Sequence, residues 1–259
     1  NSTLRVPSLL VDDVTVRFGG RVALDSVSIE VAPDEIVGLI GSNGAGKSTL
    51  LNVISGFQPV ESGQILLGGQ DISYLASHAR AAAGLGRAFQ DARLFDDLTV
   101  GECLQVARER RHRSELVADL FAFPPAVQAG RARRADAEEL LALLGLGRYR
   151  DAFISELSTG TRRIVELGCL VALEPDVLLL DEPTAGVAQR ETEAFGPLIR
   201  EIKDQLGASV VIIEHDMPLV TALSDRLYCL GAGQVIASGT PADSRPTIRQ
   251  SPSRKAWAV

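Results

Sequence analysis

The chain has 259 residues and contains few of the residues that mark several protein classes. Its three cysteines, Cys103, Cys169 and Cys229, lie far apart. That spacing fits neither a zinc site nor a disulfide framework, so we expect reduced core thiols in a cytosolic protein. Acidic side chains outnumber basic ones by 33 to 26, giving a net charge of −7. This balance argues against a nucleic-acid partner, which would require a basic surface.

Long apolar runs are also missing. Apolar runs such as 177–180 and 210–213 have the length of strands and not of membrane-spanning helices. We expect no signal peptide. With 46% hydrophobic and 23% charged residues, the composition indicates a well-packed globular protein.

The pattern of apolar residues changes along the chain. Apolar residues alternate at 14–18 and 27–31, which predicts strands, and 65–67 predicts a third. Helical spacing dominates from about 91 to 144. From Ser158 onward helices and strands alternate, as a parallel sheet requires. We therefore predict an α/β core that carries a helical insertion, followed by a tail rich in Pro and Ser.

A glycine-rich loop is the most informative motif. Residues 41–48 read Gly-Ser-Asn-Gly-Ala-Gly-Lys-Ser, filling the pattern G-x-x-x-x-G-K-[ST] directly after an apolar strand. Backbone N–H groups of such a loop surround phosphate oxygens, and the following helix adds its positive dipole end. Lys47 would reach the β- and γ-phosphates, and the Ser48 hydroxyl would bind Mg²⁺.

An acidic pair follows a second buried strand. Asp181 comes at the carboxyl end of the run 177–180, where open α/β sheets place their sites. It would hold Mg²⁺, and Glu182, one residue further, could polarise a water for in-line attack.

Three further residues cannot be assigned from local pattern alone. Ser158 is a good helix N-cap, and it could also bind a phosphate. His215, after the strand 210–213, could be an ordinary polar group or could contact a γ-phosphate. Gln90 at a predicted strand exit carries little information by itself.

Together, and in this order, these motifs resemble the nucleotide-binding subunits of ATP-binding cassette (ABC) transporters over about residues 9 to 240. The resemblance implies one α/β domain over 1–240, with a P-loop NTPase core of ABC type. That core has a mixed sheet with an antiparallel β portion, and a helical subdomain at about 91–165 is inserted in it. Residues 241–259 form a C-terminal tail.

The resemblance also implies the roles of individual residues, with ATP and Mg²⁺ as cofactors. Catalysis is assigned to Glu182, His215 and Gln90, and magnesium binding to Ser48, Gln90 and Asp181. ATP contacts are implied for Phe18, whose ring would stack on adenine, and for Ser42, Asn43, Gly44, Ala45, Gly46, Lys47, Ser48 and Thr49. Contacts across a head-to-tail dimer are implied for the signature residues Ser158, Thr159, Gly160 and Thr161.

Within this family, the segments 89–100, 182–186 and 213–217 are similar to the ATPase subunits of branched-chain amino acid importers. This implies a homo- or heterodimer of ATPase subunits at the cytoplasmic face of the membrane. A separate or fused permease would carry the solute, supplied by a periplasmic or extracellular solute-binding protein. Alternatives are an ATPase for urea or lipid and lipopolysaccharide transport, or a non-transport regulatory ATPase.

Two segments depart from the family pattern. The usual signature is Leu-Ser-Gly-Gly-Gln, whereas Thr159 and Thr161 replace the first glycine and the glutamine. The segment after Glu182, the D-loop, usually ends in an acidic residue or asparagine, but here it ends in Ala188. We expect fewer contacts across the dimer as a result.

Overall fold

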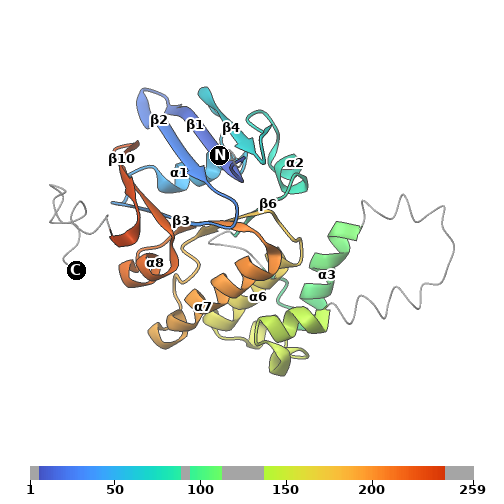
Figure 1. Cartoon of the computed structure of the whole chain (residues 1–259). Coiled ribbons are helices and arrows are strands. Elements are labelled where there is room, and N and C mark those ends of the chain that lie inside the picture. The colour runs from blue at the N-terminus through green and yellow to red at the C-terminus, as the bar shows by residue number, and fades with distance from the viewer. Residues whose placement is uncertain (1–5, 89–93, 113–136, 243–259) are drawn as a thin grey trace, which may run out of the picture. The chain divides into compact units, whose positions relative to one another are not determined.

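The computed structural model describes residues 6–88, 94–112 and 137–242. The chain forms two compact units (Figure 1). Unit 1 comprises 1–87, 176–183 and 203–259, and unit 2 comprises 88–175 and 184–202. The limits at 91 and 165 for the helical subdomain stay a prediction, and most of the expected tail lies outside the described residues. Among the described residues, no helix is both long and apolar enough to cross a membrane.

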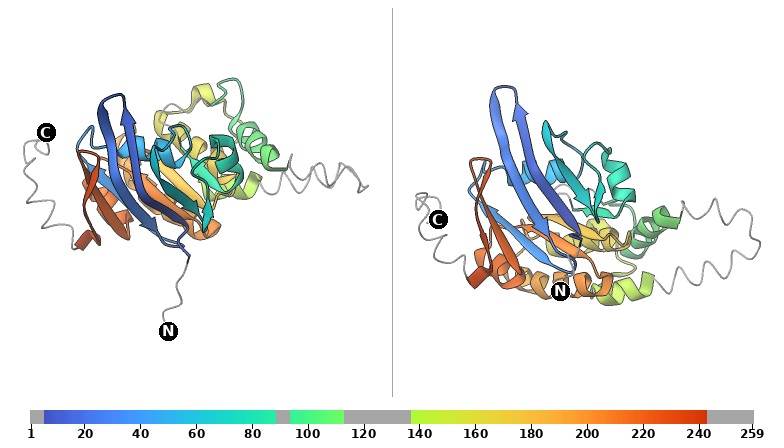
Figure 2. Two further views of the ribbon diagram at one scale, coloured as in Figure 1. Left: turned by 90° about the horizontal axis from the view of Figure 1, so that it is seen from above. Right: turned by 45° about the horizontal axis from the view of Figure 1, so that its top comes forward.

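Unit 1 contains an antiparallel sheet made from the first part of the chain (Figure 2). Its strand order is β2-β1-β4-β5. In β2 the apolar residues of the second half are buried and alternate with exposed residues, as expected for a sheet with one face on the core. The strands are β1 (Leu9–Phe18), β2 (Arg21–Val31), β4 (Ser62–Leu67) and β5 (Gln70–Asp71).

The second sheet of unit 1 has the order β10-β9-β3-β8-β7-β6. Strands β9, β3, β8, β7 and β6 are parallel, and only the edge strand β10 is antiparallel to its neighbour. The predicted α/β class with an antiparallel portion is confirmed, whereas the sequence had not indicated this antiparallel edge. The strands are β3 (Ile36–Gly41), β6 (Leu85–Arg87), β7 (Val177–Asp181), β8 (Ser209–Ile213), β9 (Arg226–Gly231) and β10 (Gln234–Gly239).

One hydrophobic cluster holds unit 1 together. It joins buried residues of the antiparallel sheet to residues of β3, β7 and β8 and to helix α1. Every residue of β3 and of β8 is buried, which explains their continuous apolar sequence. The helices of this unit are α1 (Lys47–Ile54), α2 (Ser77–Ala82) and α8 (Met217–Leu223).

Unit 2 is helical. Helix α6 approaches its neighbours so closely at Gly168 that an added Cβ would lie 2.4 Å from Leu144 Cδ1 and 2.9 Å from Leu104 Cδ2. Residues 137–143 are also helical. The named elements are α3 (Val100–His112), the short 3₁₀ turns η1 (Gly147–Tyr149) and η2 (Ile154–Glu156), α6 (Thr159–Val171) and most of α7 (Gln189–Leu206).

A buried arginine anchors the carboxyl end of α1. Arg80, in α2, is only 2% exposed. Its guanidinium donates hydrogen bonds of 2.7 Å to the carbonyl oxygens of Val53 and Ile54, and others to Leu75 and Ser73. A cation at this end of a helix satisfies its last carbonyls and opposes its dipole. Arg80 therefore fixes the helix that follows the glycine-rich loop.

We expect Arg80→Met to lower the free energy of unfolding by at least about 3 kcal/mol, because several buried carbonyls lose their donor at about 1–3 kcal/mol each. Urea denaturation followed by circular dichroism measures this. The matched control is Arg17→Met, which removes an exposed pair with Glu61 and should cost no more than about 1 kcal/mol. Equal losses in the two variants would show that the bonds of Arg80 contribute little.

Candidate functional site

The glycine-rich loop leaves the buried end of β3 and leads into α1. Gly41, Gly44 and Gly46 have φ angles of 151°, 79° and 106°, which side chains rarely adopt. Space is also short, because a Cβ at Gly46 would lie 2.9 Å from the carbonyl oxygen of Ala23. The backbone conformation of the loop therefore favours glycine at these three positions.

Lys47 lies across the loop that precedes it. Its Nζ donates to the carbonyl oxygens of Gly41, at 2.8 Å, and Ser42, at 3.1 Å. Burial lowers the pKa of this ammonium group, and the carboxylates of Glu182 and Asp181 oppose the shift. A cation held inside the loop is available to an anion that enters it.

Asp181 is the last residue of β7 and is almost fully buried. Its Oδ2 lies 3.6 Å from Nη2 of Arg87. Its Oδ1 is buried without a hydrogen-bond partner among the described residues. Burial raises the pKa of Asp181; Arg87 opposes that rise and Glu182 adds to it.

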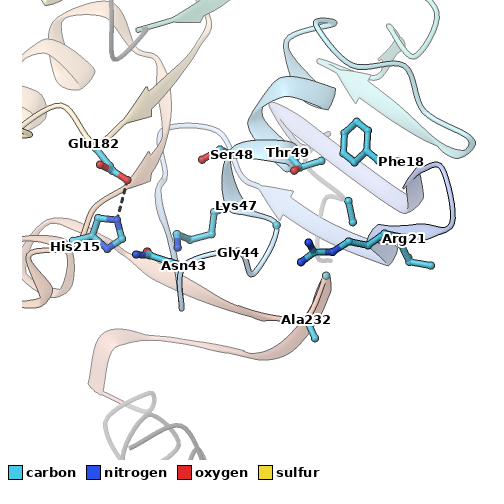
Figure 3. A pocket seen from close by; sticks show the side chains of 14 residues that line it. Phe18, Arg21, Asn43, Gly44, Lys47, Ser48, Thr49, Glu182, His215 and Ala232 are labelled. Atoms are coloured by element: carbon cyan, nitrogen blue, oxygen red, sulfur yellow. Dashed lines mark hydrogen bonds and ion pairs between the residues drawn. The ribbon is translucent and has the colours of Figure 1, made fainter. Parts of the chain in front are cut away.

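Glu182 and His215 form a pair at the ends of two neighbouring strands (Figure 3). Nε2 of His215 lies 2.8 Å from Oε1 of Glu182. The parallel strands β7 and β8 bring both residues to one edge of the sheet. Glu182 has a φ angle of 49°, and its N–H donates to the carbonyl oxygen of Ile213 at 2.9 Å. This backbone bond fixes the carboxylate beside the imidazole.

Lys47, Glu182 and His215 border one cavity of about 630 Å³ in unit 1. This volume is typical of a small-molecule site. Figure 3 shows Lys47, Glu182 and His215 toward one end and Phe18 and Arg21 toward the other. The lining therefore runs from a polar, charged end to an aromatic one. It comprises Phe18, Arg21, Val22, Ala23, Asn43, Gly44, Gly46, Lys47, Ser48, Thr49, Glu182, His215, Ala232 and Gly233.

Several residues assigned from the sequence do not line the cavity. Ala45 is buried in the hydrophobic core, and Ser42 contributes its carbonyl oxygen to Lys47. Asp181 lies beneath the surface next to Glu182. Gln90 lies outside the described residues, so its assigned role stays a prediction.

Sequence reasoning missed the part of the lining that comes from β2 and from the turn between β9 and β10. Gly233 accepts a hydrogen bond from the N–H of Asp25 and donates one to the carbonyl oxygen of Ala45. It thereby connects β2 to the glycine-rich loop. The glycines at 231 and 233 could have predicted a hairpin turn, but no local signal places that turn beside the loop.

The signature residues lie in unit 2 at the start of α6. Ser158 is the N-cap, and its Oγ accepts from the N–H of Thr161 at 3.2 Å. It also lies 3.0 Å from the Thr161 hydroxyl. At Gly160 a Cβ would lie 2.2 Å from a carboxylate oxygen of Glu191, so a larger residue here would require the Glu191 side chain to move. Ser158 is therefore the N-cap of α6, as one of its two interpretations predicted. Both the N–H and the hydroxyl of Thr161 interact with the Ser158 hydroxyl.

No group of three or more His, Cys, Asp or Glu side chains in the described part of the chain is arranged to hold a metal ion. The charged end of the cavity instead combines a phosphate-type loop with the carboxylate of Glu182, and the carboxylate of Asp181 lies next to it below the surface. This arrangement is suited to a nucleoside triphosphate.

Residues 24–185 match the family model described as ABC transporter. The chain is 38% identical over 245 residues to the high-affinity branched-chain amino acid transport ATP-binding protein LivG of Escherichia coli, covering 92% of this chain and 94% of that protein. It is 35% identical over 239 residues, with the same coverage, to BraF of Pseudomonas aeruginosa, which carries the same description.

A solved structure is also similar. The ADP conformation of MJ1267, an ATP-binding cassette of an ABC transporter, aligns with a TM-score of 0.80 and 29% identity, covering 95% of this chain and 96% of that one. The glycine-rich loop, Glu182 and His215 border one cavity, and Asp181 lies beside Glu182. Together with these likenesses, this shows that the chain belongs to the ABC transporter family, as one of its ATP-hydrolysing subunits.

Proposed function

We propose that this chain powers the import of branched-chain amino acids through a separate or fused permease, at the cytoplasmic face of the membrane. The observation that carries this proposal is the 38% identity to LivG, which extends over nearly the whole of both chains. A solute-binding protein outside the membrane would deliver the amino acid to the permease.

The arrangement around Glu182 supports a hydrolytic mechanism. A carboxylate at a strand end beside the phosphate loop can accept a proton from water while that water attacks the γ-phosphate in line. His215 holds the carboxylate through the 2.8 Å contact and can itself contact the γ-phosphate. Lys47 would exchange its bonds to Gly41 and Ser42 for bonds to the phosphates.

The residues also fit a magnesium ion that arrives with the nucleotide. Mg²⁺ uses one or two protein oxygens and takes its other ligands from water and phosphates, so a large acidic cluster is not required. Suitable oxygens are the Ser48 hydroxyl and Oδ1 of Asp181, which has no hydrogen-bond partner in the described part of the chain; Gln90 is a further candidate. When bound, the ion would neutralise charge that develops on the phosphates.

A second ATPase subunit, identical or related, would complete the site across a head-to-tail dimer. In this arrangement Ser158 and Gly160 of one subunit would face the nucleotide of the other. The Ser158 hydroxyl already interacts with Thr161, so a phosphate would compete with that contact. Dimer closure should therefore be weaker than in a cassette with the usual glutamine.

We expect Glu182→Gln to slow ATP hydrolysis by about two to four orders of magnitude, because the positioned base is lost. ATP binding should persist, since the loop and Lys47 are unchanged. Phosphate release and equilibrium ATP binding measure the two effects. Glu61→Gln, which alters an exposed carboxylate paired with Arg17, is the control. Near-normal turnover in the Glu182 variant would remove this residue from its role.

Phe18 offers a π-face to a base but no hydrogen bonds to the base edge, and its side chain is exposed at the aromatic end of the cavity. We therefore expect ATP and GTP to bind within about tenfold of each other. Phe18→Ala should weaken both by about 1–2 kcal/mol, the scale of one stacking contact. Tyr74→Ala, at an exposed aromatic outside the cavity lining, should change neither. A strong preference for ATP that survives Phe18→Ala would mean that another group reads the base.

The transport proposal is tested by reconstitution. The chain would be co-purified with its membrane partner and placed in vesicles that contain ATP and Mg²⁺, with the solute-binding protein supplied outside. We expect uptake of labelled leucine, isoleucine and valine, and none with Glu182→Gln. Transport of urea, export of a lipid, or no membrane partner at all would overturn the branched-chain amino acid assignment while leaving the ATPase chemistry intact.

A further inference from the structure

Arg87 is a buried arginine next to the magnesium carboxylate, and no role has been given to it so far. It ends β6, the edge strand, and pairs in register with Leu179, two residues before Asp181. Its side chain is only 9% exposed. A charge is costly to bury unless other groups compensate it, so its partners indicate its role.

The guanidinium of Arg87 connects two parts of the nucleotide site. Nη1 donates to Oγ of Ser55 at 2.5 Å, and Ser55 is the residue that closes the carboxyl end of α1. Nη2 lies 3.6 Å from Oδ2 of Asp181. The guanidinium carbon also lies 5.7 Å from the ring centre of Phe57. Arg87 thus joins the helix of the phosphate loop to the end of β7.

The two oxygens of the Asp181 carboxylate have different surroundings. Oδ2 faces the positive charge of Arg87, whereas Oδ1 is buried and has no hydrogen-bond partner among the described residues. A carboxylate with one oxygen held by a cation has a defined rotation about its last bond. The other oxygen is then left available for the ion that accompanies the nucleotide.

We propose that Arg87 is a positioning residue, which holds the Asp181 carboxylate oriented so that Oδ1 can receive the nucleotide's magnesium ion. This inference rests on the proposed magnesium role of Asp181. Groups that orient a metal ligand from behind typically change metal affinity or activity by about 10–100-fold when removed. The planar fork of arginine can contact Ser55 and Asp181 at once, which the single ammonium of a lysine does less well.

The test compares ATP binding to the full chain in Mg²⁺ and in EDTA, by isothermal titration. The Mg²⁺ gain is the factor by which ATP binds more tightly in Mg²⁺ than in EDTA. For Arg87→Met we expect wild-type ATP affinity in EDTA and a Mg²⁺ gain that is smaller by about 10–100-fold. The Mg²⁺ concentration that half-saturates ATP hydrolysis should rise by a similar factor. Arg87→Lys should recover part of both effects, because the charge opposite Asp181 is kept.

Two further variants separate this role from a purely structural one. Arg226→Met removes an arginine–carboxylate pair with Glu35 at the opposite ends of the parallel strands and should leave the Mg²⁺ gain unchanged. Ser55→Ala frees the anchored end of Arg87 and should reduce the gain in the same direction as Arg87→Met, but less. If Arg87→Met does not fold, Arg87→Lys and Ser55→Ala carry the test, and a wild-type gain in both overturns the inference.

Asp181→Asn distinguishes the two proposals. Loss of the Mg²⁺ gain in Asp181→Asn but not in the Arg87 variants would overturn the inference alone. An unchanged gain in Asp181→Asn would overturn the magnesium role of that carboxylate, and the inference with it.

Discussion

The parallel pairing of β3, β8 and β7 is the constraint on which the nucleotide site depends. Ile213 is in register with Leu39 on one side and with Asp181 on the other, and its carbonyl oxygen accepts the N–H of Glu182. The phosphate loop, the acidic pair and His215 therefore leave the sheet at one edge. A slip of one residue in this pairing would turn every side chain of a strand to its other face. Because these strands are buried on both faces, their apolar contacts stabilise the pairing register that places the site residues together.

The second constraint is the balance of charge at the phosphate-binding end of the cavity. Lys47 and Arg87 provide positive charge, and Asp181 and Glu182 provide negative charge. Each cation is also bound to uncharged oxygens, Lys47 to two loop carbonyls and Arg87 to a hydroxyl. The cations are thus held in place before a nucleotide arrives, so that little reorganisation is needed when the phosphates enter. Arg80 adds a third fixed cation at the far end of α1.

The sequence predicted the parts of this account that depend on contiguous residues. The loop at 41–48, the strand-end acidic pair and the cap at Ser158 each have a local physical signature, and the resemblance added His215 and Phe18. Contacts between distant segments could not be read in this way. Gly233 contacts the loop from almost two hundred residues away, and Arg87 on β6 reaches Asp181 on the neighbouring strand β7. The closeness of Glu191 of α7 to Gly160 is likewise visible only in the structure.

The most direct test of the central claim is a crystal structure of the chain with Mg²⁺ and adenylyl imidodiphosphate, an ATP analogue that resists hydrolysis. The account expects the phosphates within the loop at 41–48 and the base beside Phe18. It also expects Nζ of Lys47 to have moved from the carbonyls of Gly41 and Ser42 to phosphate oxygens. A nucleotide bound elsewhere, or phosphates outside the loop with Lys47 still on both carbonyls, would contradict it.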